Sequence, residues 1–378
     1  MSMTQLFWNY RRFGFAFLLL LFLSACTSMG SRTIPRDQFN YNEALVQSRN
    51  QQMLLNIVRL RYLDIPNFLA VSSVITSYSY DGNVGVAGTR ADGNSDLVPD
   101  TIRGQANLGY SERPTITYTP LAGQDFARRL LKPIPVEAVF ALGHAGWPVD
   151  ILMTTTLQRI NDVENMGFGQ VPAPGDVDIA HQFQREEQKL QRFQHVLKLI
   201  TVLLDREALE VQRRGDEKLG LPYLHFAKDL PLELQSLVDE LKRELKLEPR
   251  RNTFRITDRT TERGPDEITI QSRSLMSMMS FLSRGIDIPE EDRNAGVVVV
   301  IPPAVLESIL ARVPLRIRSQ KEAPKDPYVA VKYRNNWFYI DHSDIKSKRT
   351  FATIQVFFQL AAPSGGAAAP LLTLPAGG

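Results

Sequence analysis

The residue types that carry most enzyme chemistry are sparse and scattered in this chain of 378 residues. No pair of its five histidines has the spacing of zinc ligands. They are His144, His181, His195, His225 and His342. The chain has no G-x-x-x-x-G-K-[ST] phosphate loop, no G-x-S-x-G nucleophile elbow and no H-E-x-x-H zinc helix. We therefore expect no catalytic residue, no metal site and no cofactor.

Three weaker signals each have a simpler explanation. The glycines of GNVGVAG, residues 82–88, lie within a strand pattern and do not open a helix, so a phosphate loop is disfavoured. His144, between glycines and a tryptophan, lines a pocket in one interpretation and packs or bonds at a helix end in the other. The acids of IDIPEED, from Asp287 through Glu290, Glu291 and Asp292, predict a solvated turn. Acid–base catalysis needs carboxylates held in different environments.

Charge excludes one class of partner. The chain carries 44 Lys and Arg against 41 Asp and Glu, a nearly balanced surface. A nucleic-acid-binding domain presents a strongly basic face. We therefore expect no nucleic-acid partner.

The single cysteine, Cys26, lies directly after a leader-like segment. Arg11 and Arg12 precede an apolar run of 11 residues, Phe13 to Leu23, with no acid before it. A membrane-spanning helix needs roughly 20 apolar residues, so this run matches the core of a cleaved signal peptide better. The tetrapeptide Leu23-Ser24-Ala25-Cys26 resembles the lipobox of bacterial lipoproteins.

That resemblance implies a location and a modification. Cys26 becomes the acylated N-terminus after the lipoprotein processing machinery removes residues 1–25. Thr27 stands where the family's inner-membrane retention signal has Asp, which implies sorting to the outer membrane. We expect a palmitate-bearing protein held there by its lipid and facing the periplasm. No second cysteine remains for a disulfide.

The expected organisation follows from composition. The segments are a signal peptide at 1–25, a lipidated tether at 26–38, a first domain at 39–170, a second domain at 171–361 and a disordered Pro/Gly/Ala tail at 362–378. The boundary near 170 lies in the Gly/Pro-rich loop NMGFGQVPAPGD.

The first domain is predicted to combine a helix with a long hairpin. Residues 41–63 have a helical apolar period that ends before Pro66. Residues 72–89 and 102–119 alternate with period two, so one face is apolar and the other polar. Pro114 indicates an edge or a bulge. The helix at 41–63 is the expected cover of the apolar face. The alternative is a membrane-inserted hairpin in a closed ring of many copies, because open strand edges are not tolerated in lipid.

The remaining elements mix without regular alternation. We predict strands at 149–160, 209–214, 253–257, 267–271, 297–301 and 315–319, helices at 124–132, 135–146, 178–204, 230–245, 274–285 and 343–360, and a hairpin at 328–341 turning at Asn335-Asn336. An oxygen side chain among Asp341, Ser343 and Asp344 is expected to cap the last helix. This mixture, without Rossmann or barrel alternation, predicts an α+β fold.

Function is the least constrained inference. The stretch from the helix at 41–63 through ERPTITYTPLAGQDFARRLL, and KYRNNWFYIDHSDIKSKRTF, are similar to predicted Gram-negative lipoproteins of no assigned activity. We expect a non-catalytic binding or scaffold lipoprotein that joins an unknown envelope protein, with a possible homo-oligomer. The alternatives are an envelope glycan or peptide hydrolase, which needs only two suitably placed carboxylates, and a channel subunit that uses the 72–119 hairpin.

Overall fold

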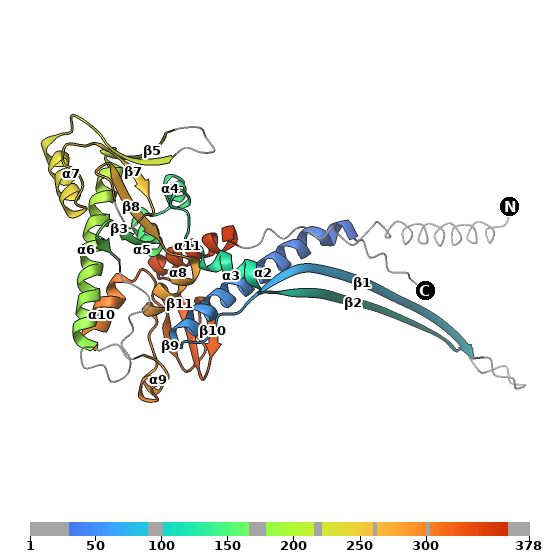
Figure 1. The fold of residues 1–378 in the computed structure, drawn as a ribbon. Helices are drawn as coiled ribbons and strands as arrows, with labels where there is room; N and C mark the ends of the chain where they lie inside the picture. Colours follow the sequence, from blue (N-terminus) through green and yellow to red (C-terminus); the bar gives the residue numbers. More distant parts are fainter. Residues whose placement is uncertain are drawn as a thin grey trace, which may run out of the picture. The chain divides into compact units, whose positions relative to one another are not determined.

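The computed structural model describes residues 30–89, 101–165, 179–214, 221–259, 263–299 and 303–361. Its contacts divide the chain into two units, Met1–Gln52 and Met53–Gly378. In the first unit the structure describes the beginning of one long helix. The second unit holds all the strands, and its mixture of helices with antiparallel and mixed sheets is the predicted α+β fold (Figure 1).

The helices come first. They are α2 (Gly30–Arg61), α3 (Gln124–Leu131), α4 (Val136–His144), α5 (Val149–Thr156), α6 (Ile179–Asp205), α7 (Leu232–Glu244), α8 (Leu275–Leu282), the 3-10 turn η1 (Ser283–Gly285), α9 (Glu290–Asn294), α10 (Pro303–Arg312) and α11 (Ile345–Ala361). Proline precedes the first residue of α4, α5, α7 and α9. The backbone N–H of the residue before a helix makes no intrahelical hydrogen bond, so a proline at this position costs the helix no hydrogen bond.

The strands form three sheets. They are β1 (Phe68–Thr89), β2 (Thr101–Leu121), β3 (Leu157–Ile160), β4 (Val163–Glu164), β5 (Leu209–Arg214), β6 (Leu221–Phe226), β7 (Thr253–Thr257), β8 (Glu267–Ser272), β9 (Arg318–Gln320), β10 (Pro327–Tyr333) and β11 (Asn336–Asp341). The orders are β1-β2, β10-β11-β9 and β4-β3-β8-β7-β6-β5. In the six-stranded sheet only β7 and β8 pair in parallel. The sheet joins β3 and β4 to strands beyond residue 170, and the predicted domain boundary lies outside the described residues.

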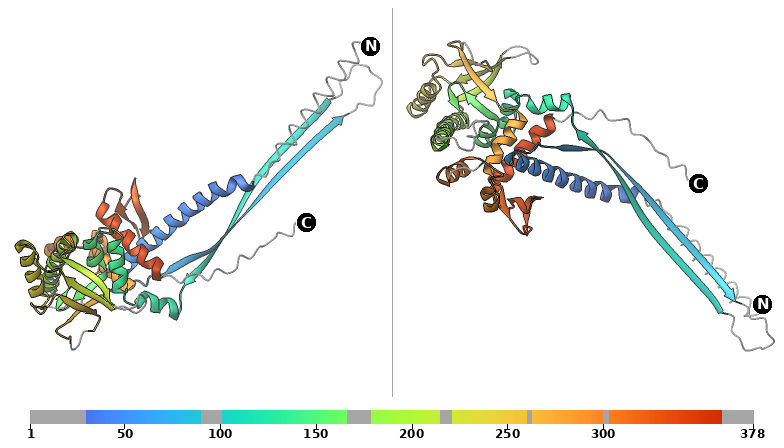
Figure 2. Two further views of the ribbon diagram at one scale, coloured as in Figure 1. Left: turned by 90° about the horizontal axis from the view of Figure 1, so that it is seen from above. Right: turned by 60° about the horizontal axis from the view of Figure 1, so that its bottom comes forward.

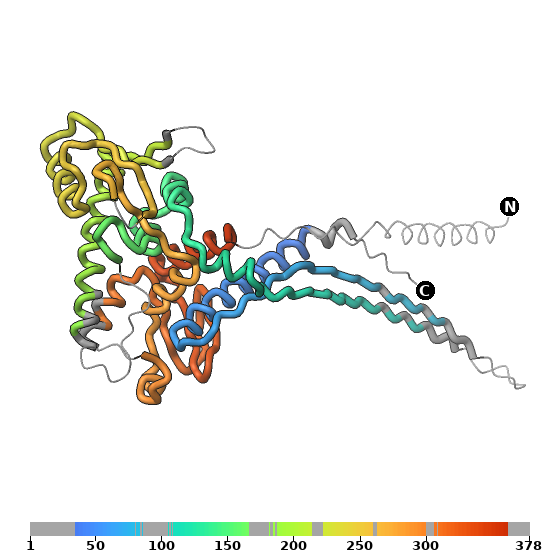
Figure 3. Tube along the Cα trace, in the orientation of Figure 1, coloured from blue at the N-terminus to red at the C-terminus, as the bar shows by residue number. Residues whose placement is uncertain are grey.

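Two apolar clusters form the core of the second unit. One lies between the six-stranded sheet and helices α6 and α7, and includes Phe193, Phe226 and Phe254. The other collects residues from the end of α2, from α8, α10 and α11, and from β10 and β11. Helix α10 lies beside α6, and the Arg312 Nη1 to Glu187 Oε1 distance is 3.2 Å (Figure 3). Residues far apart in the sequence therefore share one packed body.

Helix α2 is longer than predicted. It begins at Gly30, inside the predicted tether 26–38, and ends at Arg61. Pro35 lies near its start, where a proline removes one backbone hydrogen bond without ending the helix.

Two strand predictions are corrected. Residues 149–156 form α5, and only 157–160 continue as β3, because Pro148 begins a helix there. The threonines at 154–156 favour strands by propensity, but burial of the entire segment from Ile151 to Thr156 overrides it. Residues 297–299 are irregular, and residues 300 and 301 of that predicted strand lie outside the described part.

The C-terminal elements agree closely with the prediction. The last hairpin turns at Arg334-Asn335, one residue earlier than expected, with Arg334 at φ 52°. Helix α11 is capped by Asp344, whose carboxylate accepts from the Ser347 backbone N–H at 3.0 Å and from its hydroxyl at 2.6 Å. The predicted oxygen cap is confirmed.

Candidate functional site

Strands β1 and β2 form the long hairpin that the alternation predicts. Their pairing runs from Phe68 opposite Leu121 to Thr89 opposite Thr101, and the two strands lie side by side in both views of Figure 2. Directly opposed residues of an antiparallel pair project to the same face. Val74 opposes Ile116 and Ser77 opposes Arg113, so one face is apolar and the other polar. The pairing and the two-faced pattern are confirmed.

A bulge joins this hairpin to the core. The register shifts by one residue between Val71 and Ser73, and an extra residue exchanges the faces of a strand on its two sides. Phe68 is buried, and its ring lies 4.7 Å from Phe358 and 5.8 Å from Phe126. Because of the bulge, Phe68 enters the core from one face of the hairpin, while the apolar residues before and after the bulge share the other face.

The apolar face carries a feature that we call the hairpin stripe. Its described members are Leu69, Val71, Val74, Tyr78, Tyr110, Ile116 and Tyr118. None of the residues from 69 to 120 whose side chains the structure describes is buried. Tyr110 and Tyr118 are 52% and 55% exposed, which is unusual for aromatic residues aligned on one face.

The part of the predicted cover that belongs to the second unit, from Met53 onward, does not cover the stripe. Within the second unit, Met53, Leu54, Ile57 and Val58 of α2 are buried in the cluster that contains Phe68. No member of the hairpin stripe belongs to that cluster. For this part of the helix the prediction is wrong, because the side chains that were expected to cover the hairpin are used to build the core.

A second candidate site is an apolar cavity of about 540 Å³ beside α4 and α5. Its floor is formed by buried Val139, Leu152 and Leu209. The exposed side chains around it include His144, Asp205, Glu207 and Glu210. His144 therefore lines a pocket, as one of the two interpretations of its sequence proposed. Nothing in the sequence marks the three acids, which lie at the end of α6 and in the strand after it.

The geometry of this cavity does not assemble catalytic groups. Among the described residues, no hydrogen bond links His144 to a carboxylate, and all four ionisable side chains are open to water. A hydrolase needs a nucleophile or acid–base pair held within hydrogen-bond reach. The cavity has the apolar floor of a small-molecule site without an arranged pair of catalytic groups.

We expect substitution in this cavity to leave envelope glycan and peptide turnover unchanged. The purified His144→Ala and Asp205→Asn variants should match the wild type in peptidoglycan and casein hydrolysis assays, all at the buffer background. Glu210→Gln serves as a matched control on the same rim. A wild-type activity that His144→Ala or Asp205→Asn abolishes, with Glu210→Gln unchanged, would establish the hydrolase alternative.

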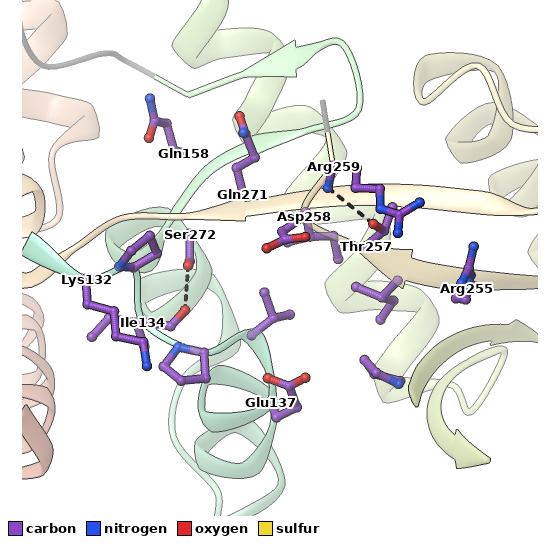
Figure 4. Close-up of a pocket in the computed structure, with 16 residues that line it drawn as sticks. Lys132, Ile134, Glu137, Gln158, Arg255, Thr257, Asp258, Arg259, Gln271 and Ser272 are labelled. Atoms are coloured by element: carbon purple, nitrogen blue, oxygen red, sulfur yellow. Dashed lines mark hydrogen bonds between the residues drawn. The ribbon is translucent and has the colours of Figure 1, made fainter. Parts of the chain in front are cut away.

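Another cavity, of about 700 Å³, lies at the edge between residues 132–137 and strands β3, β7 and β8. Figure 4 shows charged side chains of both signs around it, among them Lys132, Glu137, Asp258 and Arg259. Arg255 also lines it but pairs with Glu267. Mixed and exposed charges select no single ligand class.

The Glu267 carboxylate beside this cavity predicts an acid-sensitive contact. The Gly264 backbone N–H donates to it at 3.0 Å, and this bond together with the Arg255 guanidinium lowers the pKa of Glu267 below 4.5. A carboxyl whose pKa is lower in the folded than in the unfolded state stabilises the fold at pH values above its unfolded-state pKa. This stability is lost as the pH falls through the folded-state pKa. Between about pH 4.5 and pH 3, wild-type unfolding free energy from urea titrations should fall more steeply than that of Glu267→Gln. Parallel slopes would contradict this role, and Glu233→Gln is the exposed control.

The structure keeps the other predicted candidates apart. His195 pairs with Glu240 at 2.9 Å, and His225 bonds the Thr253 hydroxyl at 2.9 Å. His181 and His342 are exposed. Within the described ranges no three His, Cys, Asp or Glu side chains are grouped as metal ligands.

The predicted solvated turn at IDIPEED is partly wrong. Asp292 is 6% exposed and accepts from the Tyr62 hydroxyl at 2.6 Å. Burial and this bond raise the pKa of Tyr62. Asp287 pairs with Arg316, while burial raises the pKa of the Asp287 carboxyl. These acids connect α9 and its flanks to the core, and sequence alone does not reveal partners more than 200 positions away.

The predictions for the two ends of the chain lie outside the described residues. They are the signal peptide at 1–25, the lipidation site Cys26 and the tail at 362–378. Among described residues, no helix combines the length and apolarity needed to cross a bilayer.

Comparison with known proteins adds no identity. No family model matches the chain, and neither a curated protein nor a solved structure shows significant similarity to it. The candidate function therefore rests on the residues and geometry above. Of these features, the hairpin stripe is the one that packing within a single domain explains least.

Proposed function

We propose that this chain is a non-catalytic lipoprotein, anchored in the outer membrane through Cys26 and acting as a binding or scaffold component of an envelope assembly. The processing and sorting machinery for lipoproteins matures it and places it facing the periplasm. The hairpin is its contact element. The lipobox-like Leu23-Ser24-Ala25-Cys26 supports the anchor.

One observation carries the binding role. The described members of the hairpin stripe are exposed or half-buried, although they have the composition of a buried face. Exposed apolar patches on soluble domains mark interaction sites. A polar opposite face, with Ser77 and Arg113, allows the rest of the hairpin to remain in water.

The test compares assemblies in intact envelopes. Ile116→Lys places a charge in the stripe, and Thr117→Lys places the same charge on the neighbouring position of the other face. Native electrophoresis of gently solubilised envelopes should show a complex well above monomer mass for the wild type and Thr117→Lys. Ile116→Lys should lose it. A wild-type monomer under these conditions would contradict the scaffold role.

The exposed stripe also favours a second candidate, the channel subunit. A membrane strand needs about 9–11 alternating residues with aromatic residues near the interfaces, and both strands meet that length. Tyr78, Tyr110 and Tyr118 provide aromatic residues. Single-channel conductance from the purified protein in planar bilayers, abolished by Ile116→Lys and retained by Thr117→Lys, would support it.

A further inference from the structure

The hairpin has a stability problem that points to its partner. A two-stranded sheet is marginal in water unless further strands or a packed face support it. None of the residues from 69 to 120 whose side chains the structure describes is buried, whereas Phe68 belongs to the core cluster of the second unit and Leu121 packs against it. Something must cover the hairpin stripe for the paired strands to persist.

We propose that the cover is a second copy of this chain, whose hairpin packs stripe against stripe to form a two-layered, four-stranded sandwich. The inference rests on the stripe as the contact element of the proposed function and goes further by naming the partner. Two inner faces of alternating apolar side chains are the usual core of packed antiparallel sheets.

The available area fits a stable pair of copies. With 21 residues in β2, about 3.3 Å per residue and about 4.8 Å between strands, the face measures roughly 70 by 10 Å, or about 700 Å². A standard stable interface buries roughly 800 Å² per partner. The described strands outside the hairpin have at most seven residues, so they do not match this length.

The charge pattern fits self-association. In a two-fold contact the same face of both copies meets, so each residue lies close to the same residue, or to one of its neighbours, in the second copy. Like charges on that face would therefore repel. Among described residues of the stripe face, Glu112 is the one residue of the Asp, Glu, Lys, Arg and His types, and its carboxylate accepts from the Tyr110 hydroxyl at 3.4 Å. Arg113 and Asp81 lie on the opposite face.

Two residues disfavour the other ways of covering the hairpin. Pro114 has no N–H, and inside a paired strand its nitrogen faces the outer edge, which weakens edge-to-edge addition of another strand. Glu112 places a carboxylate in the middle of the face that a bilayer would contact, which is unfavourable in hydrocarbon. Face-to-face packing tolerates both, because it uses no hydrogen bonds of the strand edges and because water reaches the Glu112 carboxylate from the open side of a sheet only two strands wide.

The test is disulfide crosslinking of the full lipoprotein in intact cells. Single cysteines at Val74, Tyr78 and Ile116 sample the stripe, and single cysteines at Ser73, Ser77 and Thr115 sample the opposite face at adjacent positions. The unsubstituted chain controls for Cys26. Because disulfides form only at short Cβ separations, the best stripe position should give roughly tenfold more covalent dimer than any opposite-face position.

Each other result overturns the inference. Crosslinks at Ser73→Cys, Ser77→Cys or Thr115→Cys with none from the stripe would show that the copies pack through the opposite face. No dimer at any stripe position would show that another partner or the bilayer covers the stripe. If the envelope complex persists in that case, the proposed scaffold function stands while the second-copy partner fails.

Discussion

Replacement of Cys26 with serine is expected to abolish fatty-acid labelling and leave an unprocessed precursor. The physical reason is that a thioether to diacylglycerol needs the thiol, and serine offers only a hydroxyl. Each buried methylene contributes about 0.8 kcal/mol to membrane binding, so losing several acyl chains removes the anchor. Labelling with an alkyne palmitate analogue, followed by sucrose-gradient separation of the membranes, measures both consequences.

The neighbouring residue provides matched controls for this experiment. Thr27→Ser should be labelled, processed and sorted to the outer membrane like the wild type. Thr27→Asp should be labelled equally but shift to the inner-membrane fractions. Full labelling of Cys26→Ser would show that the lipobox assignment is wrong, and unchanged sorting of Thr27→Asp would remove the support for outer-membrane placement.

Loss of the Arg273 side chain is expected to destabilise the fold strongly. Arg273 is 1% exposed, and its Nη1 lies 2.9, 3.3 and 3.0 Å from the carbonyl oxygens of Thr154, Thr155 and Leu157. These carbonyls belong to the end of α5, where intrahelical donors are lacking. The guanidinium therefore acts as a C-terminal cap made by a residue more than a hundred positions away.

The expected cost follows from what remains after substitution. Burial and the charge of Arg284 lower the pKa of Arg273 to about 9, so the side chain is still a cation at neutral pH. It also lies 4.1 Å over the Phe281 ring. Arg273→Met removes the guanidinium donor from all three carbonyls. The Asn165 amide still donates to those of Thr154 and Leu157 at 2.9 and 2.8 Å, so we expect a cost of roughly 2–3 kcal/mol of unfolding free energy. Urea denaturation followed by circular dichroism measures the loss.

The control variants separate the cap from general effects of removing an arginine. Arg259→Met removes an exposed guanidinium and should change stability by less than about 0.5 kcal/mol. Arg273→Lys keeps a cation and should recover part of the loss. A cost below about 1 kcal/mol for Arg273→Met would mean that the α5 carbonyls find other donors.

Elements with a strong local period were predictable from the sequence. The alternation of residues 72–89 and 102–119 specifies strands, and a period of two also specifies which side chains share a face. The segment 178–204, polar in its first half and apolar in its second, was likewise predicted as a helix and forms α6. In these segments the backbone geometry and the side-chain pattern agree, so no distant contact is needed to choose between helix and strand.

Segments whose period is weak were decided by their surroundings. The β-prone threonines of 154–156 lie in α5 because Pro148 starts that helix and the packed core encloses it. Asp292 is buried because Tyr62 lies against it. Nothing near Arg273 in the sequence distinguishes it from an exposed arginine, since its partners are carbonyl groups of a separate helix.

The sequence by itself determined the two-faced hairpin, most of the helices, the lack of a catalytic motif and the lipobox-like segment around Cys26. Only the tertiary structure decided that α2 from Met53 onward enters the core, that Phe68 follows it through the bulge, and that the hairpin stripe is left exposed. The physical reason is that the period of apolar residues along a segment indicates which face is apolar, whereas what covers that face depends on contacts between distant segments.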